Sequence, residues 1–88
     1  MKIREGFILR DVAGKSFVVA TGELSREFQG MITLNETGKF IWQQLEAQKT
    51  PDEIVDAIMN EFEDADRETV ASDVKNFIDS LVKGKIVE

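Results

Sequence analysis

The side chains that could do chemistry in this sequence are almost all carboxylates. The chain contains no His, Cys or Tyr, so general acid–base catalysis would have to rely on Asp, Glu or Lys. Without Cys, neither a disulfide nor a thiolate metal site can form. The serines have no His partner that could activate them as nucleophiles, and neither a G-x-G-x-x-G segment nor a P-loop occurs. We therefore expect no catalytic residue, no cofactor and no enzymatic activity.

The densest group of carboxylates is Glu61, Glu63, Asp64 and Asp66. Such a group could form a weak site for a hard cation. The D-x-D spacing at 64 and 66, however, lacks the Gly and the terminal Glu of a calcium-binding loop. We interpret the group as a solvated turn that also supplies a helix cap, and we expect no metal site.

The distribution of charge is uneven along the chain. Residues 1–49 hold seven Lys/Arg and six Asp/Glu, whereas residues 50–88 hold four and eleven, a net charge of −7. This acidic half would repel the phosphates of nucleic acid, which proteins bind mainly through Lys and Arg. It would instead suit a partner that carries basic side chains.

The N-terminal residues show neither a secretory signal nor a membrane span. Lys2, Ile3, Arg4 and Glu5 follow Met1, and no apolar run of signal-peptide length comes after them. No stretch reaches the roughly 18 apolar residues that a membrane helix needs. The cytoplasm is the expected compartment, and the length predicts a single domain over residues 1–88.

The first third of the chain predicts three strands. Residues 7–12 and 16–20 are rich in β-branched and aromatic side chains and are separated by a turn at Ala13-Gly14-Lys15, which indicates a hairpin. Residues 21–30 are polar and predict a loop with a strand extension near Phe28. Residues 31–34 predict a third strand, with Ile32 and Leu34 on one face and Met31 and Thr33 on the other.

The rest of the chain predicts three helices. Asn35 is a strong cap for a first helix that contains Ile41 and Trp42, and Gly38 lets another element approach it closely. Thr50, Pro51 and Glu53 form a complete start signal for a second helix. The third helix spans residues 67–83 with Asp66 as its cap, Gly84 in the left-handed conformation after its end, and a packed or paired tail at Ile86 and Val87.

Three strands followed by three helices predict an α+β domain with a three-stranded antiparallel sheet. The last two helices form a helix-turn-helix-like pair, so a DNA-binding regulator is one hypothesis, although its recognition helix would lack a basic footprint. A structural or oligomerisation domain is another. A third hypothesis is a peptide-binding module, because the short third strand can lie at an open sheet edge that accepts an extended peptide.

Three segments together resemble the coenzyme PQQ synthesis protein D (PqqD) family. They are LNETGKFIWQQL at 34–45, TPDEIVDAIMNEF at 50–62 and DVKNFIDSLVKGKIV at 73–87. The resemblance covers about residues 31–87, and the N-terminal strands match it in character only. It implies a winged-helix-like fold and a non-catalytic peptide-recognition element. Such an element binds the leader of a ribosomally made precursor peptide and presents it to a separate modifying enzyme, often a radical SAM protein.

The resemblance also implies where the leader binds. In the family, the leader adds as a strand beside the third strand, in a groove shared with the third helix. Carried over to this sequence, the strand side comprises Met31, Ile32, Thr33 and Leu34, and the helix side comprises Asp73, Val74, Phe77, Ile78 and Leu81. Asp73 would meet a basic leader residue, while each apolar helix residue could equally belong to the core. The pathway, whether PQQ, a lasso peptide or another, and the formation of a homodimer are left open.

Overall fold

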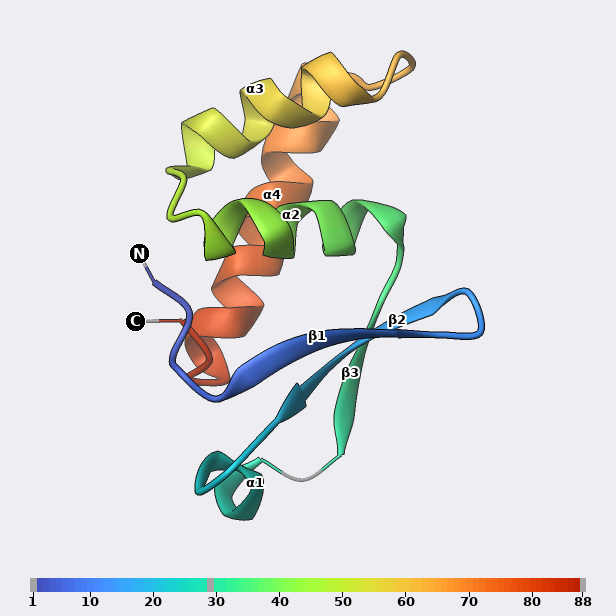
Figure 1. Cartoon of the computed structure of the whole chain (residues 1–88). Coiled ribbons are helices and arrows are strands. Elements are labelled where there is room, and N and C mark those ends of the chain that lie inside the picture. Colours follow the sequence, from blue (N-terminus) through green and yellow to red (C-terminus); the bar gives the residue numbers. More distant parts are fainter. Residues whose placement is uncertain (1, 29, 88) are drawn as a thin grey trace.

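The computed structural model describes residues 2–28 and 30–87, and it confirms the predicted α+β fold (Figure 1). Three strands form an antiparallel sheet in the order β1-β2-β3, where β1 is Phe7–Val12, β2 is Lys15–Ala20 and β3 is Met31–Leu34. Three longer helices, α2 (Glu36–Glu46), α3 (Pro51–Glu61) and α4 (Arg67–Lys83), lie on one side of this sheet. The last strand in sequence is therefore also an edge strand of the sheet.

The hairpin between β1 and β2 closes through a two-residue loop. Val12 lies opposite Lys15, and both Ala13 and Gly14 have positive φ angles, 53° and 79°. Two successive positive φ angles are the conformation that matches the twist of a tight antiparallel hairpin. The predicted hairpin is confirmed, and its second strand begins one residue earlier than expected.

The segment between β2 and β3 differs from the prediction. In place of a loop with a strand extension, it contains a one-turn helix, α1, at Leu24–Glu27. Leu24 and Phe28 both pack against the core, and the rings of Phe28 and Phe7 meet edge to face with centroids 5.0 Å apart. These contacts with residues far away in sequence decide the local conformation, so a local pattern did not predict it.

All three longer helices begin at the residues that the sequence predicts. Asn35 precedes α2, Glu36–Glu46, and Asp66 precedes α4, Arg67–Lys83. The helix between them, α3, spans Pro51–Glu61 and starts with a complete capping box. In that box the backbone N–H of Glu53 donates to Thr50 Oγ1 at 3.2 Å, and the backbone N–H of Thr50 donates to the Glu53 carboxylate at 2.9 Å.

α4 ends at Lys83 as predicted, but the left-handed residue that follows it lies one position further along the chain than expected. Gly84 has φ −79°, so the prediction of a left-handed Gly84 is wrong, and Lys85 takes that conformation with φ 61°. The backbone N–H of Lys85 donates to Val82 O at 3.0 Å, and that of Ile86 donates to Leu81 O at 2.9 Å. These two hydrogen bonds form a Schellman motif, and Ile86 and Leu81 are both buried in the core, as is common for the apolar residues that flank such a motif.

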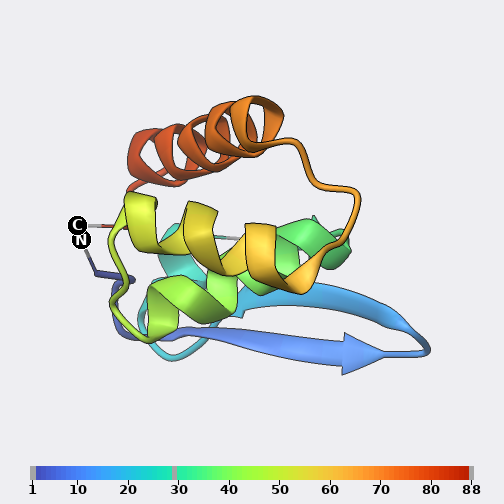
Figure 2. The ribbon, with the colours of Figure 1, turned by 90° about the horizontal axis from the view of Figure 1, so that it is seen from above.

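The helices and the sheet form two layers (Figure 2), and residues of both contribute to one apolar core cluster. Trp42, Ile54, Leu45 and Val18 are at most 1% exposed, which places Trp42 in the core and not in a surface stacking site. Val87 pairs with Ile3 in an isolated antiparallel bridge. That bridge confirms the predicted paired tail and brings the two ends of the chain together.

Candidate functional site

The open edge of β3 is the first feature of the candidate site. Its register with β2 pairs Val19 with Met31 and Ser16 with Leu34, so one edge of β3 is used. Within residues 2–28 and 30–87 no strand pairs with its other edge. As predicted, Leu34 is buried and Ile32 half-buried on the helix-facing side, while Met31 and Thr33 are exposed on the other. An edge of this kind carries backbone N–H and C=O groups that can pair with an added strand.

The other edge of the sheet, on β1, is less suited to accept a strand. β1 contains the charged residues Arg10 and Asp11, whereas β3 contains none. Asp11 accepts hydrogen bonds from Lys39 Nζ at 2.8 Å and from Ser16 Oγ at 2.6 Å. The Lys39 ammonium, together with the Ser16 hydroxyl, lowers the pKa of the Asp11 carboxyl below its usual 3.8. Charges on an edge strand discourage pairing with another chain, so the uncharged edge on β3 is the better suited of the two to accept a strand.

A polar corner joins β3 to α2 and orients both. The side chain of Asn35 accepts a hydrogen bond from the backbone N–H of Gly38 at 2.7 Å, and Leu34 anchors the corner with only 7% of its surface exposed. An N-cap of this kind satisfies one of the free donors in the first helical turn. The corner therefore holds the end of β3 in a defined position relative to α2.

A pocket of about 430 Å³, here called the corner pocket, opens between the start of α2 and the middle of α4. It is lined by Asn35, Thr37, Gly38, Ile41, Asp73, Asn76 and Phe77. Gly38 makes room for it, because a Cβ at that position would lie 3.4 Å from Phe77 Cε2 and 3.1 Å from Asn35 Oδ1. The pocket thus offers an aromatic wall, an amide and a carboxylate at the C-terminal end of β3.

A second, smaller pocket of about 240 Å³, here called the strand pocket, lies at the other end of β3. Ile32, Met31 and Phe28 contribute to its lining, together with Val18 of the neighbouring strand. Its lining combines these apolar side chains with Glu27, so it can accept the apolar part of a peptide side chain. β3 therefore has a pocket at each of its two ends.

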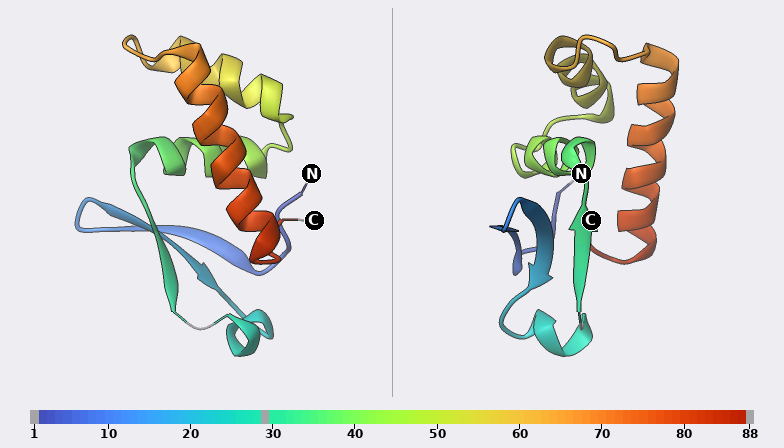
Figure 3. Two further views of the ribbon diagram at one scale, coloured as in Figure 1. Left: turned by 180° about the vertical axis from the view of Figure 1, so that it is seen from behind. Right: turned by 90° about the vertical axis from the view of Figure 1, so that its right-hand side faces the viewer.

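The structure divides the predicted site residues of α4 into two groups. Val74, Ile78 and Leu81 are 1%, 5% and 3% exposed and belong to the core. Phe77 is half-buried and Asp73 is exposed, and both line the corner pocket. In Figure 3, the right-hand panel shows β3 on the side of the sheet nearest to α4. Phe77 and Asp73 therefore contribute to the surface of the corner pocket, whereas the other three side chains belong to the core.

Among the pocket residues that the sequence did not identify as part of the site are Asn76, Thr37 and Phe28. Asn76 and Phe77 follow Asp73 by three and four residues, so both lie beside it on the helix surface, and this periodicity could have identified Asn76. Thr37 directly precedes Gly38 at the start of α2. Phe28 is an isolated aromatic residue in a polar segment, and its tertiary contacts with Phe7 and Arg4 place it at the strand pocket.

Two features are absent from the part of the chain that the structure describes. Among residues 2–28 and 30–87, no three side chains of His, Cys, Asp or Glu are placed to hold a metal ion. No helix there has the length and apolar character needed to cross a membrane.

The exposed surface of α4 also lacks a basic footprint. Arg67 donates a hydrogen bond to Asp56 at 2.6 Å, so part of its charge is neutralised. The remaining Lys75 and Lys83 are balanced by Glu68, Asp73 and Asp79 on the same helix. A helix that entered a DNA groove would normally carry an excess of basic residues, and this arrangement does not favour the DNA-binding hypothesis.

Comparison with known families gives a match to the coenzyme PQQ synthesis protein D (PqqD) family over residues 7–87. The chain belongs to the PqqD family. The resemblance that the sequence indicated is confirmed, and the match includes the N-terminal hairpin that the sequence motifs did not cover. No curated protein matches closely enough for comparison.

Two solved structures are similar to this PqqD-family chain. One is described as TbiB1 in complex with the TbiA(beta) leader peptide, with a TM-score of 0.79 and 30% identity, covering 100% of this chain and 95% of that chain. The other is described as lasso peptide synthetase B1 complexed with the leader peptide, with a TM-score of 0.75 and 17% identity, covering 93% and 89%. At that lower identity the second structure supports the fold only.

Proposed function

We propose that this chain binds the leader of a ribosomally made precursor peptide as an added strand on β3. The observation that carries the proposal is the open, uncharged edge of β3 with a pocket at each end. The likeness to TbiB1, whose structure contains a leader peptide, supports it.

The geometry explains how affinity and specificity would arise. Backbone hydrogen bonds to Met31–Leu34 hold an extended peptide without regard to its sequence. Alternate peptide side chains then point toward the helices, where the strand pocket and the corner pocket receive them. Four paired residues extend over roughly 13 Å, so the two pockets select side chains at the two ends of a short segment.

We assign separate roles to the residues of this site. Met31, Ile32, Thr33 and Leu34 supply the receiving strand, and Phe77 supplies the wall of the corner pocket. Asp73 attracts a Lys or Arg of the leader. Val74, Ile78 and Leu81 keep α4 in place from inside the core.

The chemistry that modifies the precursor would come from a separate enzyme. The chain has no His, Cys or Tyr, and we propose that it acts as a non-catalytic chaperone that presents the peptide to its partner, such as a radical SAM protein. The cytoplasm, where ribosomes release the precursor, is the compartment that we propose for this encounter. A homodimer formed through β3 would compete with the peptide for the same edge.

The test is an amide chemical-shift titration of the full chain with the leader half of a small peptide encoded beside its gene. Strand addition predicts saturable shifts concentrated on residues 31–34 and 73–77, with small changes on β1. A scrambled peptide of the same composition is the control. If neither peptide causes saturable shifts, or if both cause the same shifts, the proposal of specific leader binding fails.

The same samples also test the two other hypotheses. A DNA-binding regulator predicts retention on heparin or binding to duplex DNA at low salt. An oligomerisation domain predicts a stable dimer by light scattering, with β3 amides protected from exchange before any peptide is added.

A further inference from the structure

A third pocket, here called the acidic pocket, lies where α3 ends and α4 begins. It has a volume of about 610 Å³. Its floor is apolar and consists of Ile58, Phe62, Ala65 and Val70. Phe62 meets Phe40 edge to face, with ring centroids 5.7 Å apart, which holds this part of the floor in place. Phe62 and Ala65 remain half-buried, so an incoming side chain can still cover them.

The rim of the acidic pocket carries only negative charge. Its carboxylates are Glu61, Glu63, Asp64, Asp66 and Asp73, and no Lys or Arg lines the pocket. Asp66 is occupied as the cap of α4, where it accepts hydrogen bonds from the backbone and hydroxyl of Thr69. Within the described ranges, the other four make no ion pair or side-chain hydrogen bond. Four uncompensated carboxylates around an apolar floor favour a ligand that combines a cation with an apolar group.

The acidic pocket is continuous with the site on β3. Thr37 and Asp73 line both the acidic pocket and the corner pocket. Thr37 lies in the first turn of α2, which directly follows β3 and Asn35. Figure 2 shows the start of α2, the turn after α3 and the start of α4 gathered at the same end of the molecule. A peptide that pairs with β3 and continues beyond its C-terminal end therefore passes the corner pocket and reaches the acidic pocket.

We propose that the acidic pocket binds a second segment of the same precursor peptide, which carries Lys or Arg beside a large apolar side chain. This proposal rests on the function proposed above. The segment is the flank that leaves β3 at its C-terminal end, so it precedes the paired stretch if the peptide is antiparallel to β3 and follows it if the peptide is parallel. Two linked contacts raise overall affinity, because the second binds at a high effective concentration once the first has formed.

The test compares three synthetic peptides copied from the precursor encoded beside the gene. The first is the shortest peptide that produces the full set of shifts on residues 31–34, and the other two extend it at its N-terminus or at its C-terminus. Each dissociation constant is measured by fluorescence anisotropy at low and high salt. We expect one extension alone to tighten binding roughly three- to tenfold at low salt, with a smaller gain at high salt.

Two triple variants of the full chain locate the source of that gain. In the test variant, Glu61→Gln, Glu63→Gln and Asp64→Asn remove charge from the rim. In the control variant, Glu5→Gln, Glu23→Gln and Glu46→Gln remove the same charge from exposed positions outside the acidic pocket. The gain should disappear in the test variant and persist in the control variant, while both variants bind the shortest peptide as the unmodified chain does.

The binding measurements distinguish a failure of this inference from a failure of the proposed function. If the shortest peptide binds but neither extension tightens binding, or if the test variant keeps the gain, the acidic pocket is not a peptide site and the function on β3 stands. If no peptide binds at any length, the proposed function fails and this inference fails with it.

Discussion

The ring of Phe77 on α4 lies against Gly38 on α2, so closely that a Cβ on Gly38 would be 3.4 Å from Phe77 Cε2. This contact joins the helix that follows β3 to the helix that faces it, and it forms one wall of the corner pocket. Gly38 is buried, but Phe77 keeps part of its ring exposed. Phe77 thus combines a packing role with a surface on which a peptide side chain could rest.

Replacing Phe77 with Ala should weaken peptide binding more than it weakens the fold. We expect a loss of about 1–3 kcal/mol in the free energy of unfolding, less than for a fully buried Phe, and a roughly tenfold loss of affinity for the leader. Phe77→Leu is the control because it keeps an apolar side chain in the pocket. Urea denaturation and isothermal titration calorimetry measure the two effects. Unchanged affinity in Phe77→Ala would remove the corner pocket from the binding site.

Replacing Asn35 with Ala should lower stability by about 1 kcal/mol, because the backbone N–H of Gly38 loses its acceptor. The geometry of binding should be largely kept, since Leu34 still anchors the corner. Asn35→Ser restores an oxygen acceptor and should recover most of the loss. Urea denaturation of both variants gives the comparison, and an Ala variant as stable as the original chain would show that the cap contributes nothing.

Hydrogen exchange should distinguish the two edges of the sheet without any mutation. On saturation with the leader peptide, amides of Met31–Leu34 that face the open edge should exchange at least about tenfold more slowly. Those of Phe7–Val12 serve as the internal control and should change little, because charged Arg10 and Asp11 disfavour strand addition there. Protection that rises on β1 instead would place the peptide on the opposite edge.

The contact between Lys39 and Asp11 should appear in the acid titration. Because the Lys39 ammonium lowers the pKa of Asp11, the stability that this contact adds is present above the unfolded value of 3.8 and is lost as the pH falls through the lower folded value. Lys39→Met should raise the pKa of Asp11 toward 3.8, as measured by carboxyl carbon chemical shifts.

Glu53 provides a control within the same titration. Its pKa is lowered by the backbone N–H and the side chain of Thr50, so Lys39→Met should leave it unchanged. If the pKa of Asp11 also stays unchanged in that variant, Lys39 is not the main cause of its shift.

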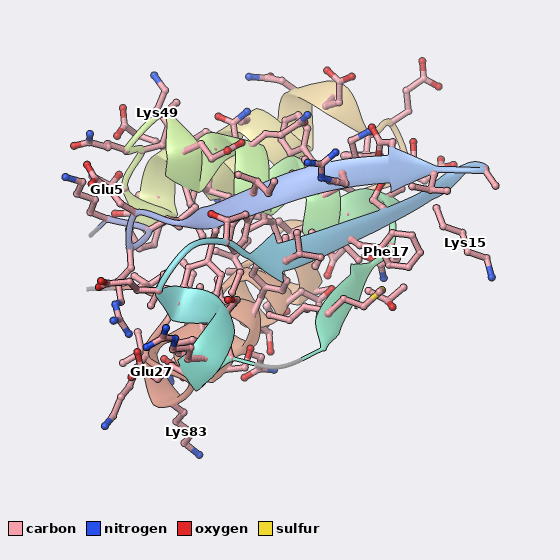
Figure 4. All side chains as sticks on the ribbon, turned by 60° about the horizontal axis from the view of Figure 1, so that its bottom comes forward. Glu5, Lys15, Phe17, Glu27, Lys49 and Lys83 are labelled. Carbon is pink, nitrogen blue, oxygen red and sulfur yellow. The ribbon has the colours of Figure 1, made fainter. Side chains whose placement is uncertain are left out.

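The outer face of the sheet also shows how strand register places side chains. Cross-strand pairing aligns Arg10, Phe17 and Thr33 on the face away from the helices. Figure 4 labels Phe17 on this face, beside β3. Alternation along β3 was readable from Met31–Leu34 alone, because successive side chains of a strand point to opposite faces. The sequence alone could not tell which residues of β1 and β2 lie beside Met31–Leu34, because that depends on the register of the whole sheet.

The sequence by itself determined those features in which the hydrogen-bonded residues are only a few positions apart in the chain. Asn35, Thr50 with Glu53, and Asp66 cap helices as predicted, because each cap binds the backbone of the turn that it precedes. The Ala13-Gly14 hairpin belongs to the same class. Periodicity likewise identified the apolar stripe of α4 and the two faces of β3.

Only the tertiary structure decided what depends on contacts between distant segments. The apolar stripe of α4 did not distinguish Val74, Ile78 and Leu81, which are in the core, from Phe77, which lines the pocket. Periodicity shows which side of a helix a residue is on, but not how completely a neighbouring element covers that residue. The same reason applies to α1, which forms where Leu24 and Phe28 meet the core, and to Lys85, which takes the left-handed position expected of Gly84. The corner pocket and the acidic pocket, which share Asp73, also depend on the tertiary structure. Their walls come from helices that meet only after the chain has folded.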